Sequence, residues 1–277
     1  MVIFIHLKTE STRSIERAGV LCERLRSQGV RCLASETNAA LLGAYAEPAD
    51  ISSAQFDLLA AVGGDGTMLE ASRLAIERDK PVFGVNAGRV GFLCAFEAEG
   101  IEELKLSDIY ALKASRRAIL EASLKPGEIS YAVNEITLNK TDFSKTVEFE
   151  TFYGSNSLGH YRADGIIVST PTGSTGYSLS AGGPITDPEL RAMVVTPICA
   201  HSLMSRSQVL AGAYPFRIIP AQRFANEMRV SIDGGAYGEC DEENGLSVAL
   251  SRRTLSLLAN EKRSFYDVLF KQISQRR

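Results

Sequence analysis

Residues 57–67, Asp-Leu-Leu-Ala-Ala-Val-Gly-Gly-Asp-Gly-Thr, join a run of mostly apolar residues to a glycine-rich turn. The apolar run predicts a buried strand that ends near Gly63. Thr67 suits the N-cap of a helix, and residues 68–76 have helical spacing. A strand, a glycine-rich turn and a helix start together form an anion site. Glycine permits positive φ and close backbone approach, and the first helical N–H groups point at the ligand.

Asp65, in the middle of this turn, is unexpected in an anion site because its carboxylate would repel a phosphate. Two arrangements remove the conflict. Either a divalent cation lies between the carboxylate and the phosphate, or a hydroxyl group that is about to be phosphorylated donates a hydrogen bond to Asp65. The alternative is a tight turn in which Asp and Gly serve geometry alone. Asp65 is therefore the candidate catalytic residue.

The composition is that of a soluble globular protein, with 277 residues, 45% of them apolar and 23% charged. The net charge of −3 argues against a broad basic surface for nucleic acid. Five scattered cysteines without a C-x-x-C pair indicate a reduced, intracellular compartment and argue against a zinc site. No signal peptide is recognisable, and no apolar run approaches the ~20 residues that span a bilayer. We therefore expect a cytoplasmic protein without membrane association.

Strands alternate with helices in the first part of the chain, which predicts a parallel, Rossmann-like α/β layer. The predicted strands are 2–7, 30–33, 58–62 and 81–85, and the predicted helices are 10–28 and 67–76. Residues 36–54 are expected to form a loop or a weak helix. Both Gly63–Thr67 and Asn86–Gly91 follow strand ends, so we expect them at one edge of the sheet, facing one crevice.

After about residue 108 the chain consists of short β-rich runs separated by turn residues, which predicts a second, mainly antiparallel β domain. These runs are 118–124, 129–139, 147–153, 165–169, 216–219, 228–232 and 246–250. A closing helix is expected at 264–275. The predicted organisation is an α/β domain at 1–108, joined by the C-terminal helix 264–277, and a β-rich domain at 109–252.

Two further segments of the predicted β domain carry chemistry. Asn134 and Glu135 are adjacent in a strand-like run, so they serve one ligand only if they lie at a strand end or a bulge. The alternative is a solvated polar pair. Residues 164–184 form a strand, a turn dense in hydroxyl groups and a short helix on which Tyr177 and Ser180 share a face. Small side chains with many donors suit a bound nucleotide, and the flanking apolar residues argue against a flexible linker.

Together these segments resemble the NAD kinase family. The matching pieces occur in family order: Gly63–Thr67, Gly84–Leu93, Asn134-Glu135, Asp164–Gly183, Thr196–Leu203, Ile232-Asp233-Gly234 and Phe265–Leu269. The Gly63–Thr67 pentapeptide is shared with diacylglycerol, sphingosine and 6-phosphofructo-kinases, whereas the segment after Asp164 is specific. Two positions depart from the family: Gly176 stands where Ala is usual, and Gly235 where Gln is common.

The resemblance implies that the protein uses ATP and a divalent cation, expected to be Mg²⁺, to phosphorylate the adenosine-ribose 2′-hydroxyl of NAD, which yields NADP. It also implies a β-sandwich-like second domain, a cleft between the domains, and a homodimer or homotetramer. By this resemblance Asp65 contacts the acceptor ribose and is the proposed base. The implied ATP and phosphate site comprises Gly63, Gly64, Gly66, Thr67 and Asn86. The implied NAD site comprises Asp65, Gly66, Phe92, Asn134, Glu135, Asp164, Ser174, Thr175, Gly176, Tyr177, Ser180 and Asp233.

The sequence leaves alternatives open for the role of Asp65 and for the substrates. A carboxyl with an ordinary pKa of about 3.9 is a weak base at neutral pH. A loose phosphoryl-transfer transition state needs positioning more than deprotonation. Aligning the acceptor hydroxyl is therefore as strong an interpretation of Asp65 as accepting its proton. A lipid kinase would need a basic or amphipathic membrane-binding segment, which the sequence lacks. A non-catalytic NAD(P)-sensing module would have no use for Asp65. ATP or polyphosphate as donor, and NAD or NADH as acceptor, stay open.

Overall fold

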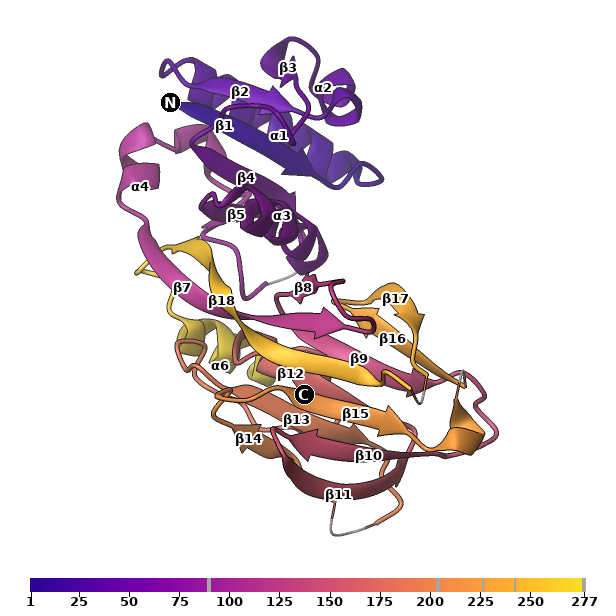
Figure 1. Cartoon of the computed structure of the whole chain (residues 1–277). Coiled ribbons are helices and arrows are strands. Elements are labelled where there is room, and N and C mark those ends of the chain that lie inside the picture. The colour runs from indigo at the N-terminus through magenta and orange to yellow at the C-terminus, as the bar shows by residue number, and fades with distance from the viewer. Residues whose placement is uncertain (89–90, 203–204, 226, 242, 276–277) are drawn as a thin grey trace. The chain divides into compact units, whose positions relative to one another are not determined.

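The structure is a computed structural model that describes residues 1–88, 91–202, 205–225, 227–241 and 243–275. Arg89, Val90 and Leu203 of the quoted motifs therefore lie outside the described residues. The chain divides into two compact units, which are described separately (Figure 1). Unit 1 comprises Met1–Arg116 and Leu255–Arg277, and unit 2 comprises Arg117–Thr254.

Unit 1 is built on a parallel sheet with the strand order β3-β2-β1-β4-β5, and β6 also pairs with β5. Apolar side chains occupy both faces of the central strands, which is typical of a sheet covered on both sides. The predicted parallel α/β layer is thus confirmed. The strands are β1 (Val2–Leu7), β2 (Arg31–Ala34), β3 (Glu47–Pro48), β4 (Leu58–Gly63), β5 (Val82–Asn86) and β6 (Phe96–Glu97).

The helices of unit 1 begin where side chains cap them. The side chain of Ser11 accepts a hydrogen bond from the N–H of Ser14 at the start of α1. The side chain of Ser35 accepts one from the N–H of Asn38 at the start of α2. Part of the region expected to be a loop or weak helix is therefore a capped helix. The helices are α1 (Thr12–Arg26), α2 (Glu36–Leu42), η1 (Gly43–Tyr45), α3 (Asp65–Arg78), η2 (Ile101–Glu103), α4 (Leu106–Tyr110) and α6 (Phe265–Gln275).

Helix α3 starts earlier than the sequence predicted. Its N-cap is Gly64, which offers no side chain, whereas the predicted cap Thr67 is the third residue of the helix and is 5% exposed. Thr67 is buried because its side chain fills the space beside Gly63. The N–H groups of the first turn therefore have no side-chain cap and are open to a ligand.

Unit 2 contains two groups of antiparallel strands. One sheet has the order β14-β13-β12-β9-β16-β17, and the other has β11-β10-β15-β18, with β7 pairing with β18 and β8. The strands are β7 (Lys113–Ser123), β8 (Ser130–Ala132), β9 (Glu135–Lys140), β10 (Val147–Tyr153), β11 (Asn156–Ala163), β12 (Gly165–Ser169), β13 (Met193–Ile198), β14 (Gln208–Leu210), β15 (Phe216–Pro220), β16 (Met228–Ile232), β17 (Gly235–Glu239) and β18 (Leu246–Ala259).

Both groups of strands contribute to one apolar core, as in a β-sandwich. Leu138 and Ile166 come from one sheet, and Phe149 and Ile218 come from the other. The predicted antiparallel β fold is therefore confirmed. Strand β11 was not predicted, because as an edge strand it exposes most of its side chains and lacks an apolar run. The short helices η3 (Thr172–Thr175), α5 (Tyr177–Ser180) and η4 (Gln222–Phe224) complete the unit.

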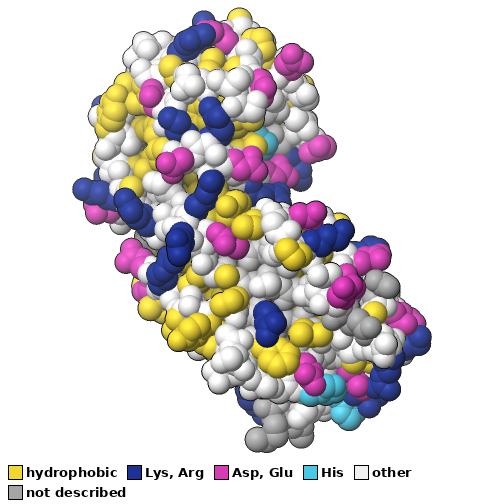
Figure 2. Space-filling view, viewed as in Figure 1, with side chains coloured by type: hydrophobic (Ala, Val, Ile, Leu, Met, Phe, Trp, Pro, Cys, Tyr) yellow, Lys and Arg dark blue, Asp and Glu magenta, His cyan; other side chains and the backbone are white. Residues whose placement is uncertain are grey.

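The surface carries charges of both signs. Figure 2 shows acidic and basic side chains interspersed over the face in view, as expected from 30 basic and 33 acidic residues. Within the described part of the chain, no helix is long and apolar enough to cross a membrane.

Candidate active site

The two glycine-containing segments of unit 1 lie side by side at the carboxyl edge of the parallel sheet. Gly63, the last residue of β4, is in register with Asn86, the last residue of β5. The N–H of Ala87 donates a 3.0 Å hydrogen bond to the carbonyl of Gly63. The sequence prediction that both segments share one edge is confirmed, because neighbouring parallel strands end together.

The glycines of the turn allow close approach, as the sequence predicted, but they do not supply the predicted positive φ. None of Gly63, Gly64 and Gly66 has a positive φ. At Gly63 an added Cβ would lie 2.3 Å from Thr67 Oγ1, so only glycine lets α3 approach the strand. At Gly64 and Gly66 an added Cβ would meet no heavy atom within 4 Å. These two glycines thus leave space beside the uncapped N–H groups of α3, where an anion fits.

Asp65 opens α3 and is partly withdrawn from water. Its Oδ2 accepts a 3.3 Å hydrogen bond from the N–H of Phe92, while Oδ1 is buried without a hydrogen-bond partner. Burial raises the pKa of Asp65, and the N–H groups of Phe92 and Leu93 and the charge of Arg263 offset part of this effect. The ordinary pKa assumed from the sequence is therefore wrong: Asp65 is a stronger base than a solvated aspartate.

Asn86 and Phe92 also contact protein groups. Asn86 is 2% exposed, donates a 2.7 Å hydrogen bond to Glu97 Oε2 and accepts one of 3.1 Å from the N–H of Gly88. Phe92 packs against the ring of Phe265 with centroids 5.7 Å apart. Asn86 thus shapes the segment after β5, and its direct contact with ATP stays a prediction.

In unit 2, Asp233 organises the segment before β9. Its carboxylate accepts hydrogen bonds of 2.9, 2.8 and 3.1 Å from the N–H groups of Val133, Asn134 and Glu135. Asp233 and Gly234 both have positive φ in the two-residue turn between β16 and β17, which is the geometry that an Asp-Gly pair favours. Asp233, predicted to contact NAD, therefore also supports the neighbouring residues of the predicted NAD site.

Glu135 is the most perturbed carboxyl group of this cluster. It is the first residue of β9, so the pair Asn134-Glu135 lies at a strand end, as a shared ligand requires. Glu135 is 9% exposed, and its Oε2 is buried without a hydrogen-bond partner. Burial and the nearby charge of Asp233 raise its pKa from 4.5 to about 7, although the N–H of Tyr177 opposes the shift. A ligand hydroxyl would satisfy this orphaned oxygen.

The hydroxyl-rich segment packs against Asn134. An added Cβ at Gly173 would lie 2.1 Å from the Asn134 carbonyl, so this contact demands glycine. Ser174 is completely buried, donates to the carbonyl of Pro171 at 2.7 Å and accepts from the N–H of Thr186 at 3.1 Å. Ser174 therefore holds the turn together, and its contact with NAD stays a prediction.

Three other predicted NAD contacts lie at α5. Tyr177 is 43% exposed, and Ser180, three residues later, is exposed too. An added Cβ at Gly176 would lie 3.0 Å from Glu135 Oε2 and 3.2 Å from the Gly173 carbonyl. The glycine that replaces the family's usual alanine therefore leaves room beside the Glu135 carboxylate. Thr175, just before it, donates weakly to the carbonyl of Thr172 at 3.4 Å.

Asp164 is not part of this cluster. It precedes β12, whereas Ser169 at the other end of β12 is in register with Glu135. The carboxylate of Asp164 forms a 2.6 Å ion pair with Lys140, whose side chain is only 11% exposed. The structure thus brings together Asn134, Glu135, Gly176 and Asp233. Asp164 lies apart from them, at the opposite end of β12 from Ser169.

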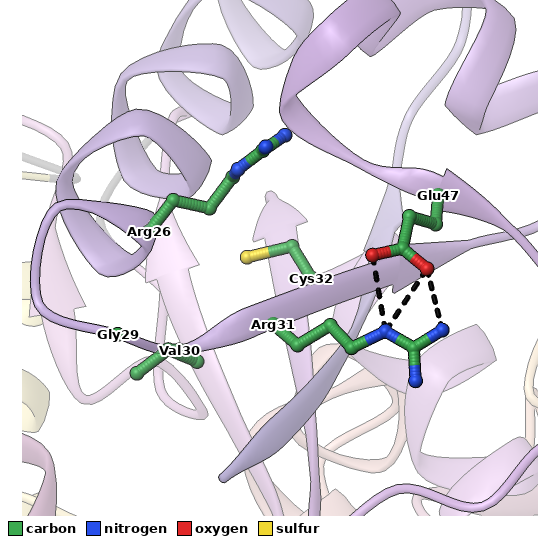
Figure 3. Close-up of a pocket in the computed structure, with 6 residues that line it drawn as sticks. All are labelled: Arg26, Gly29, Val30, Arg31, Cys32 and Glu47. Carbon is green, nitrogen blue, oxygen red and sulfur yellow. Dashed lines mark hydrogen bonds and ion pairs between the residues drawn. The ribbon is translucent and has the colours of Figure 1, made fainter.

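The described residues hold no cluster of metal ligands, and one cavity of unit 1 lies away from Asp65. Within the described residues, no group of three or more His, Cys, Asp or Glu side chains is arranged to hold a metal ion. A cavity of about 230 Å³ lies at the start of β2 in unit 1, the opposite edge of the sheet from Asp65. Figure 3 shows that the Arg31 guanidinium in this cavity is turned to the carboxylate of Glu47, with Nε–Oε distances of 3.0 and 2.9 Å.

Comparison with known proteins decides the family. A profile of the ATP-NAD kinase N-terminal domain matches residues 5–111, and a profile of the ATP-NAD kinase C-terminal domain matches residues 133–259. The NAD kinase of Sulfurimonas denitrificans is 33% identical over 248 residues, which cover 88% of the chain and 86% of that protein. The chain belongs to the NAD kinase family.

Two solved structures share the fold of this NAD kinase. Yeast NADH kinase, complexed with NADH, superposes with a TM-score of 0.88 at 23% identity and covers 99% of this chain and 87% of its own. An NAD kinase from Archaeoglobus fulgidus, in complex with ATP, gives a TM-score of 0.78 at 24% identity and covers 99% of both chains. The family match favours NAD kinase over the lipid kinase that the pentapeptide alone allows.

Two residues beside the NAD kinase site were missed from the sequence. Arg263 and Glu97 contact the segment after β5, and Arg263 also influences Asp65 electrostatically. They are 166 positions apart in the numbering, and neither lies in a motif that marks it. No local sequence signal identifies them, because Arg263 contacts backbone carbonyl groups and Glu97 contacts the side chains of Arg263 and Asn86, partners that only folding brings together.

We predict that substitutions at two glycines of the turn have different effects, one on thermal stability and the other on ATP binding. Gly63→Ala should lower the thermal stability of the enzyme, because its methyl group overlaps Thr67. Gly66→Val should unfold near the wild-type temperature but raise the KM for ATP strongly, because its side chain enters the space beside the helix N-terminus. Thermal unfolding and initial-rate kinetics test this. Normal ATP kinetics in Gly66→Val would show that phosphates do not use this turn.

The raised pKa of Glu135 predicts a pH-dependent stability. A carboxyl whose folded pKa lies above its unfolded pKa destabilises the fold progressively between the two values, here from pH 4.5 to about 7. Glu135→Gln should therefore be more stable than wild type by a margin that grows over this window and then stays constant, on the order of 3 kcal/mol. Denaturant unfolding at several pH values measures the margin. A margin independent of pH would contradict the assignment.

Proposed function

We propose that Asp65 is the catalytic carboxylate with which this NAD kinase phosphorylates NAD to NADP at the expense of ATP. One observation carries the proposal: a partly buried carboxylate with an unused acceptor oxygen opens a helix whose first N–H groups are uncapped. The open N-terminus suits phosphate, and the carboxylate suits a hydroxyl donor.

In the proposed reaction, Asp65 accepts a hydrogen bond from the 2′-hydroxyl of the adenosine ribose and takes its proton. The ribose oxygen bonds to the γ-phosphorus of ATP while the bond from that phosphorus to the β,γ-bridging oxygen breaks and ADP leaves. The raised pKa of Asp65 favours this proton transfer relative to a solvated aspartate. The uncapped N–H groups of α3, with Gly64 and Gly66 leaving space beside them, would hold phosphate oxygens. Positioning and charge stabilisation then supply most of the rate acceleration.

The acceptor is assigned to unit 2. The orphaned Oε2 of Glu135 and the carboxamide of Asn134 would bind the adenosine part of NAD, with Tyr177 and Ser180 offering an exposed ring and hydroxyl on α5. Thr175, Gly176 and Asp164 remain in the proposed NAD site. The yeast protein of this fold was solved with NADH and the archaeal one with ATP, which supports the proposal that this chain binds both kinds of substrate.

The divalent cation is proposed to enter as a complex with ATP. Mg²⁺ keeps several waters and binds substrate phosphates rather than all-protein cages, so no dedicated ligand cluster is needed. The homodimer or homotetramer and the cytoplasmic location stay predictions. A direct assay with NAD or NADH as acceptor and ATP or polyphosphate as donor, each with Mg²⁺, identifies the substrates by the NADP or NADPH formed.

Replacing the proposed base tests the proposal. Asp65→Asn should lower kcat on the order of 10²-fold or more, because the amide aligns a hydroxyl poorly and accepts no proton. Its thermal stability should equal or exceed that of the wild type at pH 7, since the substitution removes a buried charge whose pKa is raised. Asp79→Asn, at the other end of α3 in a left-handed conformation that Asn tolerates, is the matched control. Wild-type kcat in folded Asp65→Asn would refute the catalytic role.

Asp164 gives a separate prediction for acceptor binding. Asp164→Ala should raise the KM for NAD tenfold or more, about 1.4 kcal/mol, with a smaller change in kcat. Glu135→Ala should lower kcat as well, if its carboxylate fixes the ribose. Lys140→Met breaks the same ion pair but keeps the carboxylate, so it separates a binding role from a structural one. An Asp164→Ala enzyme with impaired KM for ATP and normal KM for NAD would reverse the assignment.

A further inference from the structure

One arginine, Arg263, connects the segment that precedes α6 to the loop after β5. Arg263 Nη1 donates a 2.8 Å hydrogen bond to the carbonyl of Cys94, and Nη2 donates a 3.0 Å hydrogen bond to the carbonyl of Gly91. The same Nη2 lies 2.7 Å from Glu97 Oε1. The side chain of Arg263 is 17% exposed and that of Glu97 is 42% exposed, so the guanidinium is largely shielded from water while the carboxylate is in part solvated. One guanidinium thus connects three points of a short loop.

The contacts of Arg263 continue to the end of β5. Glu97 forms the ion pair with Arg263 through Oε1, and its Oε2 accepts a 2.7 Å hydrogen bond from Asn86 Nδ2. Asn86 in turn accepts from the N–H of Gly88. The planar guanidinium and the carboxylate therefore form a continuous polar chain from the C-terminal segment to the last residue of the strand.

The loop held by Arg263 is the one that touches Asp65. The N–H of Phe92 donates to Asp65 Oδ2 at 3.3 Å. At the adjacent Gly91, an added Cβ would lie 2.4 Å from Asp65 Oδ1, so the backbone of Gly91 lies directly against the carboxylate. The carbonyl of this same Gly91 accepts from Arg263. A shift of this carbonyl therefore moves the groups that fix Asp65.

We propose that Arg263 is a positioning residue for phosphoryl transfer: it fixes the carbonyl groups of Gly91 and Cys94 and so holds the loop that orients the Asp65 carboxylate. This inference rests on the proposed catalytic role of Asp65. A displacement of about 1 Å at a reacting group costs on the order of 10²-fold in rate, so a tether outside the reacting atoms has a measurable effect on kcat. Arginine is required because its planar guanidinium donates to several acceptors at once in a fixed geometry, whereas a lysine ammonium is a compact point charge.

The charge of Arg263 provides a readout that a purely structural tether lacks. Among the described residues, the titratable groups that act on Asp65 or on its neighbour Cys94 are Arg263, Glu97 and the Cys94 thiol itself. Burial raises the pKa of Cys94 to about 12, so this thiol stays neutral near pH 7. Arg263 lowers the pKa of Asp65. Removing it raises that pKa further, and the base is then protonated up to a higher pH.

The experiment compares Arg263→Met, Arg263→Lys and the control Arg17→Met, which breaks another ion pair of unit 1, between Arg17 and Glu102. Arg263→Met should lower kcat about tenfold or more with smaller changes in both KM values, and the acidic limb of its kcat profile should move to higher pH. Arg263→Lys should keep the acidic limb near its wild-type position and still show reduced kcat. Arg17→Met should change neither kcat nor the position of the acidic limb. If Arg263→Met does not fold, Arg263→Lys alone decides, through its kcat.

A double variant separates this inference from the proposed function. In the Asp65→Asn background, Arg263→Met should leave the residual rate almost unchanged, because Arg263 acts through Asp65. Full kcat in Arg263→Lys, a wild-type kcat and pH profile in Arg263→Met, or additive losses in the double variant would overturn the positioning role. An active Asp65→Asn enzyme would instead overturn the proposed function itself.

Discussion

The partial burial of the Asp65 carboxylate is the constraint on which unit 1 depends. Removing a charge from water is costly, and the fold offsets only part of that cost with N–H groups and a nearby guanidinium. One oxygen stays without a partner. The protein thus keeps a carboxylate that is less stable in its charged form than a solvated one, and this is the condition under which an aspartate becomes a useful base near neutral pH.

Unit 2 holds two neighbouring carboxylates in different hydrogen-bond environments. Asp233 is satisfied by the N–H groups of Val133, Asn134 and Glu135, whereas Glu135 is buried with an orphaned oxygen. The satisfied group fixes the backbone, and its coulombic interaction with Glu135 helps to raise the pKa of that neighbour. Two acidic residues close together therefore have distinct roles because their hydrogen-bond environments differ.

Backbone packing accounts for several residues that look like ligands in the sequence. Ser174 and Asn86 are buried, and protein groups contact their side chains. Gly63 and Gly173 are glycines because a neighbouring residue approaches the backbone closely, and neither uses a positive φ. Residues that shape a turn thus stand in the same motifs as residues proposed to bind ligands, and spacing alone does not distinguish the two.

The sequence alone determined the fold class, the family and the location of both chemical clusters, because strand periodicity, turn residues and motif spacing are local properties of the chain. Those signals placed β1 and β4 closely and put Asp65 at a strand end. Only the tertiary structure decided the pKa of Asp65, the start of α3 at Gly64 and the tether formed by Arg263. Burial, close packing and hydrogen bonds to distant carbonyl groups depend on residues far apart in the chain, so no local pattern encodes them.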